Sequence, residues 1–173
     1  MSGKVTDDDS GLRELRARLA ALKGARVRVG VLADAPKREP RGAHSKKARV
    51  RAKVEKRAAG ARQLSLIEVA AIHEFGAGHV PARSFIRATI DERRADIAKL
   101  QVLVGKQILA GKITSEQGLA TIGAKVAGWM KERIAAGIAP PLKPRTIKRK
   151  KSSKPLIDTG QLRSSITYAV EGG

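Results

Sequence analysis

The chain has 173 residues, no cysteine and a formal net charge of +20. Its length suits one domain, 1–173, with a modest core. The absence of cysteine excludes disulfides and thiolate metal sites, and no apolar run is long enough to cross a bilayer, so we expect a soluble protein without membrane contact. A charge this large indicates a polyanionic neighbour, either nucleic acid or an acidic protein surface.

The N-terminal part predicts an amphipathic helix followed by a strand. A helix capped by Asp9 or Ser10 and closed by Gly24 would carry four leucines at helical spacing. These are Leu12, Leu15, Leu19 and Leu22. The next residues, 26–32, alternate charged or small side chains with aliphatic ones, which is the period of a strand with one buried face.

The segment 37–62 predicts a basic inserted arm. It carries eleven Lys and Arg residues against two Glu, and such blocks repel themselves until something negative neutralises them. Residues 48–55 within it fit a strand or a helix equally well. The arm either lies near phosphates or is only a solubilising surface segment.

Residues 64–78 predict a short helix and a turn. Ser65 and Glu68 form a capping-box pair, in which the hydroxyl accepts from an amide of the first turn and the carboxylate accepts from the cap. Gly76 sits where a helix usually ends in a positive-φ residue, so the helix should stop at Phe75.

The following residues predict a long helical hairpin. A helix that begins at about Ser84 and ends near Gly111 would place a stripe of aliphatic side chains on one face. Thr114 and Gln117 form a second capping box and open another helix, which Gly137 ends.

The C-terminal part predicts a loop, a helical turn and a strand. Pro140, Pro141 and Pro144 interrupt regular structure at the start of 140–155, so this basic run is expected to be an exposed loop. Asp158 with Gln161 can cap a short turn before a strand over 165–170, which should pair with the strand over 26–32. The predicted fold class is α+β: a small antiparallel sheet packed against several helices, including a long helical hairpin, with extended basic loops or arms.

Two segments resemble one known family. IHEFG at 72–76 followed by VPARSFIR at 80–87 looks like the helix and IPARPFLR signature of phage minor tail and tail-completion proteins, the neck proteins of lambda-like and Mu-like long-tailed phages. PLIDTGQLRSSITYAV at 155–170 is similar to the PL-x-x-T-G-x-L-x-x-S-I ending of the same group. Together they cover roughly a quarter of the chain, in the family's order. Ser84 departs from the proline often found there, and 37–62 looks like an insertion relative to shorter members.

The resemblance implies a structural protein of the virion neck or tail, assembled in the host cytoplasm. Its role would be tail completion, tail termination or head–tail joining, as a ring of identical subunits at the head-proximal end of the tail. Because tail tubes have sixfold symmetry, the homo-oligomer would be a hexamer closed by head-to-tail contacts. Its partners would be the tail tube protein, head–tail connector proteins and the viral DNA that crosses the channel independently of sequence.

The candidate contacts to DNA or to an acidic partner lie in the two basic runs. The chain has only four aromatic residues, and none lies in either run, so a contact should follow the phosphate backbone without stacking on bases. The candidates are Lys46, Lys47, Arg49, Arg51, Lys53, Lys148, Arg149, Lys150 and Lys151.

The candidate subunit or partner interface surrounds Phe85. This phenylalanine lies between Arg83 and Arg87, a composition enriched at interface hot spots. The alternative is that Phe85 fills the core and both arginines are solvated. The full set of interface candidates is His73, Glu74, Phe75, Arg83, Phe85 and Arg87.

Catalytic patterns are weak, so the sequence predicts no enzyme, no metal and no cofactor. His73-Glu74 lacks the second histidine of a zinc helix motif, and no strand–turn nucleophile of the G-x-S-x-G form occurs. The triplet 158–160 superficially matches an aspartic-protease motif, but a helix cap explains it better. The alternative function is a nonspecific DNA-binding protein of nucleoid or ribosomal type, which the charge alone would support.

Overall fold

The computed structural model describes residues 9–32, 64–150, 153–157 and 160–172. The elements follow one another in the order α1 (Ser10–Leu22), β1 (Arg26–Val31), α3 (Leu66–Phe75), α4 (Arg87–Glu92), α5 (Arg94–Leu109), α6 (Ser115–Ala136), α7 (Pro144–Lys150), α8 (Gln161–Ser164) and β2 (Ile166–Glu171). The predicted α+β class is confirmed: within the described ranges, seven helices accompany a two-stranded antiparallel sheet.

The sheet joins the two ends of the described chain. Strands β1 and β2 pair antiparallel from Arg26 opposite Glu171 to Val31 opposite Ile166, as the alternation predicts. On the face turned away from α6, Glu171 forms ion pairs with Arg26 at 3.0 Å and with Arg28. The pairing therefore brings residues at least 135 positions apart in the sequence into direct contact.

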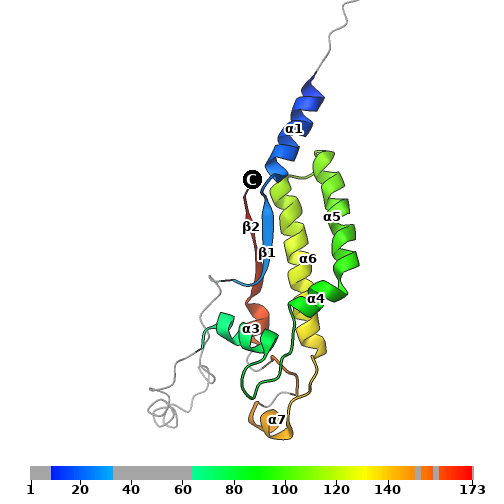
Figure 1. Cartoon of the computed structure of the whole chain (residues 1–173). Coiled ribbons are helices and arrows are strands. Elements are labelled where there is room, and N and C mark those ends of the chain that lie inside the picture. Colours follow the sequence, from blue (N-terminus) through cyan, green and yellow to red (C-terminus); the bar gives the residue numbers. More distant parts are fainter. Residues whose placement is uncertain (1–8, 33–63, 151–152, 158–159, 173) are drawn as a thin grey trace, which may run out of the picture.

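Helix α6 is the central element of the fold. It lies against the sheet on one side and against α5 on the other, so the predicted helical hairpin is confirmed (Figure 1). Two glycines permit these close approaches. A Cβ at Gly123 would lie 2.7 Å from Tyr168 and Val27 of the sheet, and a Cβ at Gly118 would lie 2.7 Å from Ile108 and Val104 of α5.

The hydrophobic core lies between α6, the sheet and the segment before α4. Its most deeply buried large side chains come from four positions spread over the chain: Phe85, Met130, Ile134 and Ile166. Leu162 of α8 and Leu156 join the same cluster. The core is therefore closed by both segments that carry the family resemblance.

The expectation of one long helix from Ser84 is wrong in two respects. The helix begins at Arg87 rather than Ser84, and it is divided at Arg93, whose φ of −100° and ψ of 11° separate α4 from α5. The two helices are held by different partners. Helix α4 is fixed at its N-terminus by a side chain of α3, described below, whereas α5 is fixed by packing on α6.

The expectation of a loop throughout 140–155 is also wrong, because α7 forms within it. Its first residue is Pro144, a position where the ring's fixed φ suits a helix and the missing N–H costs no intrahelical bond. Pro144 therefore starts a helix here and does not interrupt regular structure. The predicted turn before the last strand is present as α8, while Asp158, its expected cap, lies outside the described residues.

Helix α1 stands off from the rest of the molecule (Figure 1). Only its C-terminal end is anchored, where Leu22 packs on the core and the Arg18 guanidinium donates to the Leu109 carbonyl at 3.0 Å. Leu12, Leu15 and Leu19 stay 36–51 % exposed. Among the described residues no helix combines the length and the apolar character that crossing a bilayer requires.

Candidate functional site

The signature segment 72–87 folds back on itself around α3. The capping box predicted at Ser65 and Glu68 is present, and Gly76, with a φ of 79°, ends the helix at Phe75 as expected. Beyond this turn the chain runs back along α3, where the Arg83 amide donates to the His73 carbonyl at 2.6 Å. This return places residues 84–87 beside the last turn of α3.

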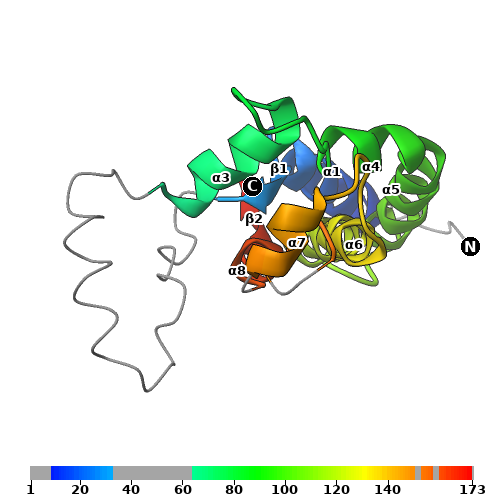
Figure 2. The ribbon, with the colours of Figure 1, turned by 90° about the horizontal axis from the view of Figure 1, so that it is seen from below.

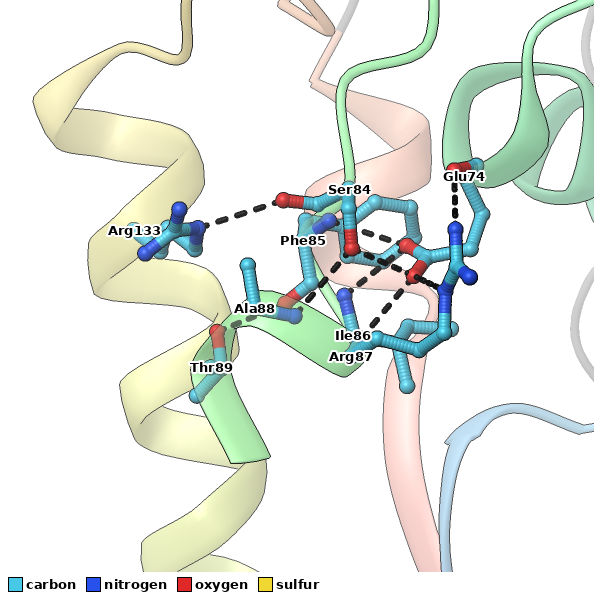
Figure 3. Close-up of polar contacts among 8 residues, drawn as sticks. All are labelled: Glu74, Ser84, Phe85, Ile86, Arg87, Ala88, Thr89 and Arg133. Atoms are coloured by element: carbon cyan, nitrogen blue, oxygen red, sulfur yellow. Dashed lines mark hydrogen bonds and ion pairs between the residues drawn. The ribbon is translucent and has the colours of Figure 1, made fainter. Parts of the chain in front are cut away.

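Glu74 is the centre of the site (Figure 3). Its carboxylate, only 3 % exposed, accepts hydrogen bonds from the backbone amides of Phe85 at 2.9 Å, Ile86 at 2.9 Å and Arg87 at 3.0 Å. The Ser84 hydroxyl donates at 2.6 Å and the Arg87 side chain at 3.2 Å. A carboxylate from one helix thus takes the amides that open the next, where negative charge is favoured.

These contacts determine the charge of Glu74. Burial by itself would raise the pKa of the carboxyl, but hydrogen bonds from the Ser84 hydroxyl and from the amides of Ile86, Arg87 and Phe85 outweigh it and lower the pKa from 4.5 to about 2. Five donors occupy the two carboxylate oxygens, and the low pKa keeps the group ionised at neutral pH. Glu74 therefore organises the backbone rather than performing acid–base chemistry.

Further hydrogen bonds tie the same segment to α6 and to the residues after it. Arg133 donates to the Ser84 carbonyl at 3.2 Å and also pairs with Glu92 of α4. Arg83 is buried and donates to the carbonyls of Pro140 at 2.8 Å and Pro141 at 3.4 Å, and burial lowers the pKa of its guanidinium. The segment 83–87 is consequently fixed on three sides.

Phe75 and Arg87 form the exposed side of the site. The Arg87 guanidinium lies 4.8 Å from the centroid of the Phe75 ring, within the range of a cation–π contact. It also donates to the Glu74 carbonyl at 3.3 Å. Phe75 itself is 66 % exposed. This large apolar ring therefore lies at the surface, where it contacts a guanidinium that Glu74 orients.

The structure brings the six interface candidates together but divides them by depth. Glu74, Arg83 and Phe85 are buried, His73 is half-buried, and Phe75 and Arg87 are exposed. Phe85 therefore belongs to the core, as the alternative held, whereas Arg83 is not solvated as that alternative assumed. Of the six, Phe75 and Arg87 are the two that a neighbouring molecule can reach directly.

Sequence reasoning missed two features of this site. Glu74 was grouped with the surface residues although it is a buried helix cap, and its partners lie ten and more residues away, across a turn. The other feature is the outward stripe of Ile67, Ala71 and Phe75 on α3, all exposed. A signal for it exists in the sequence, because LIEVAAIHEF is apolar on every face, and a helix apolar all round is normally covered.

The second signature segment, 155–170, packs at the same place. Helix α8 contacts α3, and Leu162 and Ile166 share the core cluster with Phe85. Figure 2, seen from below, shows α3 and α8 on either side of the sheet's lower end. The two segments therefore form one structural unit although about 70 residues separate them in the sequence.

Most of the candidate DNA contacts fall outside the described residues. These are Lys46, Lys47, Arg49, Arg51, Lys53 and Lys151. Lys148 is exposed on α7, the same short helix to which Arg149 and Lys150 belong. Part of the second basic run is thus presented by a helix and not by an irregular loop.

Away from Glu74, a shallow groove of about 560 Å³ lies between α5 and α6. Trp129 lies at its side with the cationic groups of Arg93 and Lys125 each 5.6 Å from its ring. The remaining lining comprises one carboxylate and otherwise aliphatic or hydroxyl side chains. The one hydroxyl of this lining, that of Thr121, donates to the Gln117 carbonyl of its own helix at 2.8 Å.

The described part of the chain contains no group of three or more His, Asp, Glu or Cys side chains placed to hold a metal ion. Comparison of the chain with protein-family models, with curated proteins and with solved structures finds no match.

Proposed function

We propose that this chain is a structural protein of the phage neck or tail, which forms a ring at the head-proximal end of the tail through which DNA passes. Its role is tail completion, tail termination or head–tail joining. The proposal starts from the resemblance of segments 72–87 and 155–170 to the family signatures. The observation that carries it is the packing of these two segments into one unit.

That packing matters because two unrelated chance matches need not meet in space. Here α3, the segment 83–87, α8 and β2 share one core, and Glu74 fixes α3 to the segment 83–87. The signature residues therefore specify a rigid scaffold, as residues of an assembly protein do, and not a constellation of reactive groups. A ring-forming protein also needs exposed apolar surface, and α1 and α3 each present such a stripe.

Electron microscopy of the purified protein tests the proposal. The protein is freed of nucleic acid with nuclease and high salt and imaged in negative stain, where closed rings of uniform diameter are expected. Antibody labelling of virions from the phage that encodes the chain should mark the junction between head and tail. Monomers in solution together with an unlabelled junction would overturn the proposal.

The net charge of +20 also supports an alternative function, nonspecific binding of DNA. A nonspecific DNA-binding protein of nucleoid or ribosomal type would bind duplex as a monomer, with an affinity that falls steeply as salt rises. Titration of a labelled duplex at several salt concentrations, combined with the mass of the protein in solution, separates the two functions. Rings formed without nucleic acid support the neck protein, and a duplex-binding monomer that never forms rings supports the alternative.

A further inference from the structure

Two apolar stripes on this molecule are exposed in the part of the chain that the structure describes. The first is the leucine stripe of α1, formed by Leu12, Leu15 and Leu19. The second is the outer stripe of α3, formed by Ile67, Ala71 and Phe75. Leu12 is 45 % exposed, Leu19 51 %, Ile67 42 % and Phe75 66 %.

The two stripes match in length and shape. Each occupies one narrow arc of its helix, and at a rise of about 1.5 Å per residue the first spans roughly 10 Å and the second roughly 12 Å. One is made of branched aliphatic side chains, and the other offers a small central alanine between a larger residue at each end. The leucine side chains of the first stripe can therefore pack over Ala71, as ridges of one helix enter the grooves of another.

Charge selects between the possible contacts. On a chain of net charge +20, two copies repel each other wherever cations meet. Helix α1 carries three arginines and one glutamate, whereas α3 is the one helix of the described ranges without Lys or Arg, and its half-buried Glu68 lies beside the outer stripe. The Arg87 charge beside Phe75 is already paired with Glu74 at 3.2 Å.

The same comparison disfavours the other exposed apolar surface. Helix α5 exposes Val102 and Leu103 by more than half, but Lys99 and Lys106 lie one turn away on either side, on the same face. A basic α1 packed there would bring its arginines beside those lysines. The outer face of α3 offers apolar surface without that repulsion.

We infer that the leucine stripe of α1 docks on the outer stripe of α3 in a second copy of the same chain. The two stripes lie at opposite ends of the molecule, so one copy does not satisfy both (Figure 1). A contact between two different patches is heterologous, passes from copy to copy and closes into a ring when the rotation allows. This inference rests on the proposed function, for which it supplies the subunit interface.

Cross-linking tests the contact directly, because a chain without cysteine allows single thiols to be placed at will. Leu15→Cys marks the α1 stripe and Ala71→Cys marks the α3 stripe, both at surface positions that leave the core intact. The proteins are treated with nuclease, mixed at high salt and exposed to a short bismaleimide. Ala95→Cys, exposed on α5, is the control thiol.

The inference expects cross-linked dimers in the mixture of Leu15→Cys and Ala71→Cys, roughly tenfold or more above either variant alone, since a preformed contact raises the effective thiol concentration toward the millimolar range. A variant that carries both cysteines should give a ladder of multimers. Mixtures with Ala95→Cys should stay at background.

Other patterns would overturn the inference. Efficient cross-linking of Leu15→Cys with itself means that α1 pairs symmetrically with α1, and a link within one chain of the double variant means that both stripes belong to one molecule. No cross-link in any mixture, while the unmodified protein still forms rings, rejects this interface and leaves the neck function standing. No cross-link and no rings rejects both.

Discussion

The buried carboxylate of Glu74 joins α3 to the start of α4 through five hydrogen bonds. Glu74→Gln keeps the shape of the side chain but removes the charge and replaces one acceptor oxygen with a donor that faces other donors. We expect the free energy of unfolding to fall by about 2 to 4 kcal/mol, as for buried donors left without partners. Denaturant unfolding measures this loss. Glu132→Gln, at an exposed site on α6, should change stability by no more than about 0.5 kcal/mol, and an equal loss in both variants would contradict the role of Glu74.

The same residue predicts how stability depends on pH. The folded pKa of about 2 lies below the ordinary value of 4.5, so the stabilisation is complete above the unfolded pKa and is lost as the pH falls through the interval between the two. The full effect is about 3 kcal/mol. Because Glu74→Gln does not titrate here, the stability difference between wild type and variant should narrow from about pH 6 to about pH 3. A difference that stays constant over that range would show that folding leaves the pKa of Glu74 unchanged.

The two phenylalanines should behave in opposite ways. Phe85 is fully buried, so Phe85→Ala removes a ring from the core and should cost about 3 to 5 kcal/mol. Phe75 is 66 % exposed, so Phe75→Ala should cost less than about 1 kcal/mol in stability. Ring formation should nevertheless suffer in Phe75→Ala if α3 is an interface. Thermal unfolding measures the loss of stability in both variants, and analytical ultracentrifugation measures the loss of assembly. A Phe75→Ala protein that assembles normally would show that the Phe75 side chain is not part of the interface.

At the scale of the elements, two glycines of α6 offer a matched pair. Gly123→Ala would place a Cβ 2.7 Å from Tyr168 and Val27, whereas Gly128→Ala meets nothing within 4 Å. Alanine gains about 1 kcal/mol of helix propensity at either position. Overpacking should reverse that gain at Gly123, for a net loss of about 1 to 2 kcal/mol, and leave Gly128→Ala neutral or stabilised. The unfolding midpoints of the two variants test this difference. Equal stabilisation of both would mean that α6 and the sheet can move apart at little cost in free energy.

The elements that sequence predicts well are those with local causes. Both capping boxes lie within one helical turn, and the strand alternation and the hairpin stripes repeat over short distances, so adjacent residues are sufficient to reveal them. The division of the long helix at Arg93 has no such local cause, since neither proline nor glycine is present there. The two helices have different anchors, since Glu74 and Arg133 hold α4 and α6 holds α5, and these contacts exist only once the chain has folded.

At the scale of the whole molecule, the sequence predicts the class of fold and the pairing of its first and last strands, but not the depth of the site residues. Glu74 and Phe75 are neighbours in the chain, yet one is buried as a cap and the other is exposed. Their difference arises from the turn at Gly76, which returns the chain along one side of α3 only. The outward stripe of α3 follows from the same asymmetry, because the returning segment leaves the opposite side uncovered.

The basic arm allows a last prediction about the whole molecule, made from sequence because 37–62 lies outside the described residues. Reversal of four arm charges, at Lys46, Lys47, Arg49 and Arg51, should leave the melting temperature unchanged. If each of these residues neutralises one phosphate, the slope of log affinity for duplex against log salt should become shallower by roughly 3 to 4, and the yield of completed particles should fall.

The control removes the same amount of charge from the folded body. It reverses four cations on or beside the helical hairpin, at Lys99, Lys106, Lys112 and Lys125, all exposed. Net charge alone would change both proteins alike, whereas a specific arm changes only the first. Since the arm leads directly into α3, loss of duplex binding without loss of rings would separate the surface that meets DNA from the surface that meets the neighbouring subunit. Equal effects in the two variants would mean that the arm is only a solubilising segment. Assembly would then depend on the apolar stripes alone.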